Sequence, residues 1–270
     1  MGISENSNIN IVHNHKTNSI ETANELKGKL RSRGFTVSDT ISEDAMVNIC
    51  IGGDGAFLRA VHASNFSSVP FLGINTGHLG FFQELCPSDL DELIDSLEQK
   101  SYSIEEIELL KATVYTKHDS FTVKAINEIA IKGVSSKVIH IDVYIDGDIF
   151  EKVSGDGLIV STPIGSTAYN FSCGGSIISP KLKTLQITPI APINSKAYRC
   201  MNNSLIVPSC SSLVVRPEYR DESSLSIISD GIQYNHHGIR EISFGYSGHK
   251  LKKLTVEGKS FWNNVREKFL

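Results

Sequence analysis

The 270-residue sequence predicts an α/β domain with a Rossmann-like parallel sheet, followed by an all-β domain that is similar to a β-sandwich. In the first hundred or so residues, short apolar runs alternate with segments whose apolar residues recur every three or four positions, which is typical of a parallel sheet covered by helices. From about residue 105 onward, short apolar runs follow one another with turn residues between them, which is typical of layered β structure. We therefore expect domains at 1–105, with 255–270 returning to it, and at 106–254.

Periodicity predicts each element of the first domain in turn. The expected strands are 9–12, 35–37, 47–51 and 70–74, and the expected helices are 19–33, 56–63 and 89–99. In the first helix, Ile20, Ala23, Leu26 and Leu30 fall on one face, and Gly34 is a stop signal. A last helical segment at 259–270 carries an apolar stripe, so we expect it to pack back on the first domain.

The second domain is predicted as a series of strands. They are 112–116, 121–131, 138–145, 157–161, 185–189, 205–207, 213–216, 225–228 and 239–246. Asp146 and Gly147 lie between alternating apolar residues and predict a tight hairpin turn. Ser166 is placed to cap a short helix that starts at Thr167.

Composition excludes several classes of protein. Lys and Arg number 26 against 30 Asp and Glu, which gives a net charge of −4 and argues against nucleic-acid binding by bulk charge. No stretch approaches the roughly 18 apolar residues that span a membrane, and the first ten residues lack an export signal. The five cysteines are odd in number and lack a C-x-x-C spacing, so we interpret them as buried thiols of a cytoplasmic protein rather than as disulfides or zinc ligands.

A glycine-rich loop joins the third predicted strand to the helix after it, at Gly52, Gly53, Asp54 and Gly55. Glycines let backbone N–H groups approach an anion, and a helix N-terminus adds partial positive charge, so the loop predicts a phosphate site. A carboxylate repels a phosphate unless it holds a metal ion or accepts a proton. Asp54 is therefore a candidate base for phosphoryl transfer to a hydroxyl group. The alternative is a simple turn with Asp54 as the helix N-cap.

The segment after the fourth predicted strand, residues 75–80, places amide, hydroxyl and small residues at the same edge of the sheet. His78 in this segment is a candidate for polarising a phosphate, and the alternative is an ordinary hydrogen-bonding loop histidine.

Two polar stretches stand out in the second domain. Asn127 and Glu128 interrupt an apolar strand pattern, which favours a binding edge over a satisfied structural pair. Residues 154–169 offer hydroxyls, backbone amides and the ring of Tyr169, a combination that suits a nucleoside. The alternative is an ordinary strand–turn–helix junction with a core tyrosine.

Taken in order, these stretches resemble the NAD kinases, which phosphorylate NAD to NADP. The resemblance covers most of the chain and rests on 52–55, 73–81, 127–128 and 155–169. The Gly-Gly-Asp-Gly loop alone is also similar to diacylglycerol and sphingosine kinases and to 6-phosphofructokinase. The resemblance implies an N-terminal α/β domain, a β-rich domain and a final helix that returns to the first domain. It also implies ATP or polyphosphate as donor, Mg²⁺ or another divalent metal ion, and a homodimer or homotetramer built through the β-rich domains.

The resemblance further implies roles for individual residues. Asp54 would accept the proton of the ribose 2′-hydroxyl, and Gly52, Gly53 and Gly55 would form the phosphate loop. The residues implied to bind the small-molecule substrates NAD and ATP are Gly55, Arg59, Asn127, Glu128, Ser154, Asp156, Thr167, Ala168, Tyr169, Asn170, Phe171, Ser172, Ala191 and Asp230. The resemblance implies no particular metal ligand, and it implies neither nucleic acid nor a membrane as partner.

Three positions depart from the usual pattern of the family. Ala56 stands where Thr is usual, Ile164 where a hydroxylated residue is common, and Ile232 where Gln is common. The missing hydroxyl at position 56 puts donor binding in question. Two alternatives to an NAD kinase stay open: a lipid or sugar kinase that shares the glycine loop, and a non-catalytic sensor that binds NAD or NADP.

Overall fold

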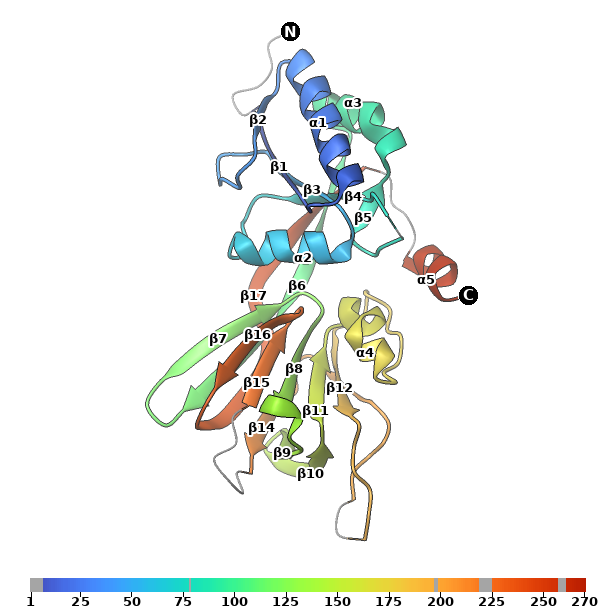
Figure 1. Ribbon diagram of the computed structural model, residues 1–270. Coiled ribbons are helices and arrows are strands. Elements are labelled where there is room, and N and C mark those ends of the chain that lie inside the picture. The colour runs from blue at the N-terminus through green and yellow to red at the C-terminus, as the bar shows by residue number, and fades with distance from the viewer. Residues whose placement is uncertain (1–6, 78, 197–198, 219–224, 257–260) are drawn as a thin grey trace. The chain divides into compact units, whose positions relative to one another are not determined.

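The computed structural model describes residues 7–77, 79–196, 199–218, 225–256 and 261–270. The chain divides into two compact units (Figure 1): Met1–Ile107 with Lys250–Leu270, and Glu108–His249. His78, and Lys259 and Ser260 of the expected last helix, lie outside the described residues.

The first unit is built on a parallel sheet. Its strands are β1 (Asn8–His13), β2 (Thr36–Ser38), β3 (Val47–Ile51), β4 (Phe71–Ile74) and β5 (Gln83–Leu85). The order is β2-β1-β3-β4, with β5 and the end of β17 (Ile239–Thr255) also paired to β4. All five residues of β3 are buried because neighbouring strands and helices surround it. Its carboxyl end therefore leads into the predicted glycine loop from a fixed position.

Helices cover both faces of this sheet (Figure 1). They are α1 (Thr17–Ser32), α2 (Asp54–Ala63) and α3 (Leu90–Gln99), with a 3₁₀ turn at Pro87–Asp89. Leu26 of α1 and Leu93 of α3 share one core with Ile49 of β3. On the other face, Phe57 of α2 packs against Phe71, with ring centroids 5.9 Å apart. Because the strand side chains alternate between the faces, one strand serves both cores.

The last helix, α5 (Phe261–Phe269), belongs to the first unit. The rings of Phe261 and Phe269 lie 5.8 and 6.2 Å from the ring of Phe81, measured between centroids. These contacts confirm the expectation that the final helix packs on the first domain.

The second unit contains a six-stranded antiparallel sheet with the order β13-β12-β11-β8-β15-β16. The strands are β8 (Glu128–Gly133), β11 (Gly157–Ser161), β12 (Thr184–Ile190), β13 (Leu205–Pro208), β15 (Leu225–Ser229) and β16 (Ile232–His236). A second sheet runs β10-β9-β14-β17, with β6 paired to β17 and to β7. Its other strands are β6 (Ser103–Thr116), β7 (Ser120–Ala125), β9 (Ile139–Ile145), β10 (Asp148–Gly155) and β14 (Leu213–Pro217).

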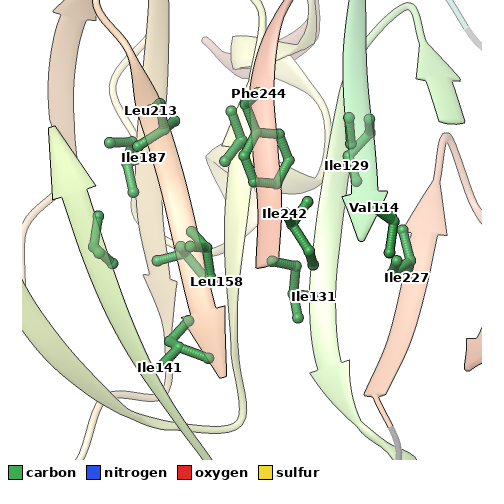
Figure 2. Close-up of a cluster of buried hydrophobic side chains, with 14 of the residues drawn as sticks. Val114, Ile129, Ile131, Ile141, Leu158, Ile187, Leu213, Ile227, Ile242 and Phe244 are labelled. Carbon is green, nitrogen blue, oxygen red and sulfur yellow. The ribbon is translucent and has the colours of Figure 1, made fainter. Parts of the chain in front are cut away.

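The core of this unit lies between its two sheets. Figure 2 shows Ile131 and Leu158 of the six-stranded sheet in one buried cluster with Leu213, Ile242 and Phe244 of the other. This layered packing confirms the predicted sandwich-like architecture. The opposite face of the six-stranded sheet is partly covered by a 3₁₀ turn at Ile164–Thr167 and the short helix α4 (Tyr169–Ser172) (Figure 1).

In this unit, some predictions for single elements are confirmed and others are wrong. The hairpin turn at Asp146-Gly147 is confirmed, with positive φ at both residues and β9 paired to β10. The single strand expected at 121–131 is wrong: it is two strands, β7 and β8, separated at Ile126-Asn127. Strands β5, β10 and β16 were not predicted as separate elements.

The cysteines are all free thiols. Cys50 is buried, the thiols at 86, 173 and 200 are half-buried and Cys210 is exposed, so the expectation that all five are buried is confirmed only for Cys50. Within the described parts of the chain, none of the helices has the length and apolar character that crossing a membrane requires.

Candidate active site

The glycine loop of the first unit turns sharply between β3 and α2. Gly52 has a φ of +148°, and a Cβ there would stand 2.6 Å from Asn14 Nδ2 and 2.8 Å from the Cβ of Ala56. Only glycine fits this conformation and this space. Gly53 is the N-cap of α2 and offers no side chain to the helix end. The loop thus brings backbone close to any anion bound at the N-terminus of α2.

The carboxylate of Asp54 is bound by backbone amides rather than by its own helix. Asp54 is the first residue of α2, so the alternative in which it is the N-cap is wrong. Its Oδ1 accepts hydrogen bonds from the N–H groups of Phe81 and Phe82 at 2.9 and 3.0 Å, and its Oδ2 accepts from Phe81 at 3.1 Å. These bonds fix the orientation of a carboxylate whose side chain is still 26% exposed. The carboxylate is held firmly and can still meet a substrate.

Gly80 allows this arrangement. A Cβ on Gly80 would overlap both the Asp54 carboxylate and the side chain of Gln83. The predicted loop at residues 75–80 thus ends in backbone groups that hold Asp54: Gly80 makes room, and the two residues after it donate their N–H groups. Those two amides escaped the sequence analysis, since no side-chain pattern marks a backbone donor.

A cation from the end of the chain meets the same carboxylate. Lys268 in the last turn of α5 places its Nζ 3.6 Å from Asp54 Oδ2 and 4.7 Å from the centroid of the Phe81 ring. Phe81 therefore contacts the carboxylate through its amide and the ammonium through its ring. Sequence reasoning missed Lys268, because nothing in the spacing of residues connects positions 54 and 268.

A cavity of about 740 Å³ lies beside the glycine loop, at the carboxyl end of β1. Its lining includes Ala56, Arg59, His13 and His15 and contains no carboxylate. The Arg59 guanidinium reaches back toward the loop, with Nη1 3.4 Å from where a Cβ of Gly55 would stand. Size and charge suit a nucleotide or another phosphorylated ligand.

The other predicted loop borders a different cavity. Asn75 and Thr76 line a space of about 460 Å³ together with Glu21 and Glu25. Two carboxylates make this space unfavourable for a phosphate. The first cavity is therefore the better candidate for an anionic ligand.

In the second unit, Asp230 organises the backbone around Asn127. Asp230 and Gly231 form the tight turn between β15 and β16, with φ of +46° and +86°. The Asp230 carboxylate accepts hydrogen bonds from the N–H groups of Ile126 at 2.7 Å, Asn127 at 2.8 Å and Glu128 at 3.3 Å. These bonds take the three amides out of the strand ladder and explain why the strand predicted at 121–131 is interrupted. Asp230 thus positions the backbone around Asn127, and its contact with a ligand stays a prediction.

Glu128 is a buried carboxyl group with an unpartnered oxygen. The residue is 7% exposed, and its Oε2 has no hydrogen-bond partner. Burial raises the pKa of Glu128 to about 8, with a further contribution from the nearby Asp230 charge, against a hydrogen bond from the Tyr169 backbone. A buried polar atom without a partner is costly, and a ligand hydroxyl would remove that cost.

Asn127 is joined to the turn that starts at Thr162. Its carbonyl accepts a hydrogen bond from the Thr162 N–H at 2.9 Å, and the Thr162 hydroxyl donates to the Ile126 carbonyl at 2.8 Å. Gly165 packs so closely that a Cβ would overlap the Asn127 backbone. The two predicted polar stretches are thus one structural unit, and Thr162 is a positioning residue that the sequence did not indicate.

Ser166 does not cap a helix, so that prediction is wrong. It lies within the 3₁₀ turn, and its hydroxyl donates to the Pro163 carbonyl at 2.6 Å and accepts from the Ile178 N–H at 2.9 Å. The helix expected from Thr167 begins instead at Tyr169, with Ala168 as its N-cap.

The predicted contacts in α4 divide into exposed and buried residues. Tyr169, Phe171 and Ser172 are exposed and available to a ligand. Asn170 is fully buried, and its side chain bonds to Thr188 and Gln186 of β12. We therefore reassign Asn170 from a ligand contact to a residue that ties α4 to the sheet.

Asp156 and Ala191 are brought together beside Gly155. The Asp156 N–H donates to the Ile190 carbonyl at 3.0 Å, and a Cβ on Gly155 would stand 2.7 Å from the Ala191 carbonyl oxygen. Asp156 and Ala191 are both exposed, and Ala191 has a φ of +44°.

Ser154, another predicted ligand contact, is fully buried. Its hydroxyl lies 2.8 Å from Nδ1 of His140. We therefore reassign Ser154 to a structural role.

Comparison with known proteins matches both units to one family. The model described as "ATP-NAD kinase N-terminal domain" matches residues 4–102, and "ATP-NAD kinase C-terminal domain" matches residues 126–253. The NAD kinase of Finegoldia magna is 46% identical over 97% of each chain, and that of Lactobacillus johnsonii is 33% identical over 96% of each.

Solved structures agree with this match. An NAD kinase from Archaeoglobus fulgidus in complex with ATP has a TM-score of 0.75 and 25% identity, over 96% of this chain and 98% of that one. Yeast NADH kinase complexed with NADH has a TM-score of 0.85 over 98% of this chain and 87% of that one; at 21% identity it shows the shared fold. The chain belongs to the NAD kinase family.

Proposed function

We propose that this protein transfers the terminal phosphoryl group of ATP to the 2′-hydroxyl of the adenosine ribose of NAD, giving NADP and ADP. Family membership over nearly the whole chain supports this reaction and favours it over a lipid or sugar kinase. The observation that carries the mechanism is the Asp54 carboxylate, oriented by two backbone amides at the N-terminus of α2.

The chemistry assigned to Asp54 is that of a general base. Its Oδ1 already accepts two amide hydrogen bonds, whereas its Oδ2 accepts only the 3.1 Å bond from Phe81 and has Lys268 at 3.6 Å. Oδ2 is therefore the oxygen with room for a substrate hydroxyl. As the ribose oxygen attacks the terminal phosphorus, Asp54 takes the hydroxyl proton and ADP leaves.

We propose that the divalent metal ion enters the site bound to the phosphates of the nucleotide, because the described residues offer it few ligands. Among the residues that the structure describes, no three His, Cys, Asp or Glu side chains gather to hold a metal ion. Mg²⁺ is commonly bound by one or two carboxylates together with substrate phosphates and water. In the alternative to its role as base, Asp54 would supply a protein oxygen to the ion; in either role the ion would neutralise charge on the phosphates.

The cavity beside α2 is the proposed site of the donor nucleotide. It adjoins the glycine loop, is lined by Arg59 and two histidines, and contains no carboxylate. Ala56 lines it in place of the usual threonine, so the lost hydroxyl is accompanied by extra room in the cavity. We therefore keep ATP as the proposed donor despite this departure. Polyphosphate remains the alternative donor.

The second unit is assigned to the dinucleotide. With its raised pKa, Glu128 is largely protonated near neutral pH, so it can donate as well as accept a hydrogen bond at a ribose hydroxyl. The exposed rings of Tyr169 and Phe171 can stack on a planar base. The roles of Gly55, Asn127, Asp156, Thr167, Ala168, Ser172 and Ala191 as substrate contacts stay part of this proposal.

The second unit is also the proposed site of self-association. Strand β10 lies at the end of its sheet, and Ile149 and Phe150 on it are 59% and 42% exposed. Met201, which is 40% exposed, belongs to a segment bonded to β10 through Glu151. An unpaired edge strand with exposed apolar side chains suits a homodimer or homotetramer interface.

Five free thiols fit a reducing compartment, and we propose the cytoplasm.

Replacing Asp54 tests the base. Asp54→Asn should keep the fold and lower kcat about 10²- to 10⁴-fold, because the amide cannot take the hydroxyl proton. NADP formation from NAD, ATP and Mg²⁺ measures this, with Asp44→Asn, an exposed change in the same unit, as control. Turnover near the wild-type value in Asp54→Asn would exclude Asp54 as the base. A wild-type protein that binds nucleotide but forms no NADP would favour the sensor alternative.

Filling the cavity tests the donor site. Ala63 is exposed and lines the cavity, so Ala63→Trp should raise the KM for ATP about tenfold or more while leaving the KM for NAD within about twofold. Ser101→Trp, at an exposed position that does not line the cavity, is the control. An equal rise in both KM values would contradict the assignment.

The raised pKa of Glu128 predicts how stability depends on pH. Between the ordinary pKa near 4.5 and the folded value of about 8, the folded state keeps a proton that the unfolded state has lost, so this group makes stability fall as pH rises. Glu128→Gln removes that dependence. Its Tm should exceed the wild-type Tm by about 3 °C or more at pH 8, and the gap should shrink toward pH 5. Glu92→Gln, an exposed change on α3, should leave the pH dependence unchanged. A gap that is constant with pH would contradict the assignment.

Charging the edge strand tests the interface. Phe150→Glu should shift the protein toward monomers in light scattering after size exclusion, because a carboxylate resists burial in an apolar contact. Lys117→Glu, at an exposed position of the same unit outside β10, is the surface control. If Phe150→Glu keeps the wild-type mass, the interface lies elsewhere.

A further inference from the structure

The cluster around Asp54 contains a cation for which the proposed reaction has so far given no role. Lys268 Nζ lies 3.6 Å from Asp54 Oδ2, a distance longer than a direct hydrogen bond. Its side chain is 34% exposed, so the ammonium is not locked into the pair. It can turn from the carboxylate toward an incoming anion while α5 stays in place.

The helix that carries Lys268 is anchored next to the reaction centre. Phe261 at its start and Phe269 at its end both contact the ring of Phe81, whose backbone N–H binds the Asp54 carboxylate. The ammonium itself lies over the same ring, 4.7 Å from its centroid. The Phe81 ring and the Asp54 carboxylate both contact the ammonium, so two contacts, and not the flexible lysine side chain alone, set its position.

The charge balance of the loop indicates what the ammonium does. Residues 52–56 contain one carboxylate and no cation, yet the reaction brings several phosphate charges against them. Arg59 is the nearby cation on α2, and it lines the cavity. Lys268 stands instead at Asp54 Oδ2, the oxygen that faces the hydroxyl in the proposed reaction. A cation at that point neutralises the group in transfer rather than the rest of the donor.

We propose that Lys268 is a catalytic residue that binds the transferring phosphoryl group through its ammonium, with Phe81 as its platform. This inference rests on the proposed function. In the step, the ribose oxygen forms a bond to the terminal phosphorus, and the bond from phosphorus to the bridging oxygen breaks. ADP leaves with that electron pair, and Asp54 takes the hydroxyl proton. Lys268 stays protonated throughout and moves from the carboxylate to the phosphoryl oxygens, where negative charge is concentrated in the transition state.

The kinetic test compares two cations of the same helical turn. Lys268→Met should lower kcat/KM for ATP at least about tenfold, with the KM for NAD within about threefold of wild type. Lys268→Arg should recover part of the loss, since the charge is kept. Arg266→Met removes an exposed charge one half-turn away and should stay within twofold of wild type. Unchanged kinetics in Lys268→Met, or a higher kcat, would overturn the proposal.

Binding and stability measurements separate this role from a merely structural one. Inorganic tripolyphosphate, titrated calorimetrically, should bind Lys268→Met at least about fivefold more weakly than wild type or Arg266→Met, while the Tm stays within about 2 °C. A loss of Tm with equal losses toward ATP and NAD would show that Lys268 only anchors α5, and would overturn the proposal. If the wild-type protein formed no NADP, the proposed function would fail, whereas weaker tripolyphosphate binding in Lys268→Met would still support an anion site at Lys268. If Lys268→Met and Arg266→Met bound tripolyphosphate equally well, the proposed role of Lys268 would be overturned.

Discussion

The hydrogen bonds from the backbone of Phe81 and Phe82 to the Asp54 carboxylate are the constraint on which the first unit depends. A carboxylate at the start of a helix would otherwise turn toward the nearest free amides of its own helix. Here, the segment that follows Gly80 supplies those amides, and the missing Cβ of Gly80 lets it approach. One oxygen is thereby saturated and the other is left for chemistry. The same segment presents the Phe81 ring to α5, so the end of the chain is tied to the loop near its start.

The second unit uses an aspartate in a related way. Asp230 also accepts hydrogen bonds from consecutive backbone amides, and three donors bind its carboxylate. The carboxyl group of the neighbouring Glu128 is buried and is uncharged over much of the neutral pH range. One of its oxygens has no hydrogen-bond partner. In the proposed function, a hydroxyl group of the substrate would bind this oxygen. In that proposal, the same group contributes both to binding strength and to selectivity.

Most of the fold could be predicted from sequence because it follows from periodicity. The alternation of apolar runs located β1, β3, β4 and their helices to within a few residues, and the Asp-Gly turn located the hairpin of β9 and β10. The prediction was wrong where one long-range contact overrides local pattern: Asp230 breaks the strand at Ile126, and Ser166 bonds to Ile178 instead of capping a helix. Asn170 and Ser154 were predicted as ligand contacts by resemblance, but only packing shows that they are enclosed. Lys268 could not be found, because pairing across the whole chain leaves no trace in spacing.

The electrostatics of the protein have to be considered locally. A net charge of −4 argues against nucleic-acid binding by bulk charge, but it says little about a site for small polyanions. Arg59, His13 and His15 line a cavity without a carboxylate, and Lys268 stands at the one carboxylate of the glycine loop. Such placement would let a chain of net negative charge bind the phosphates of the proposed donor. Because the potential of a charge falls off within about 10 Å at moderate salt, Arg59 and Lys268 have more influence on an anion at the loop than the net charge has.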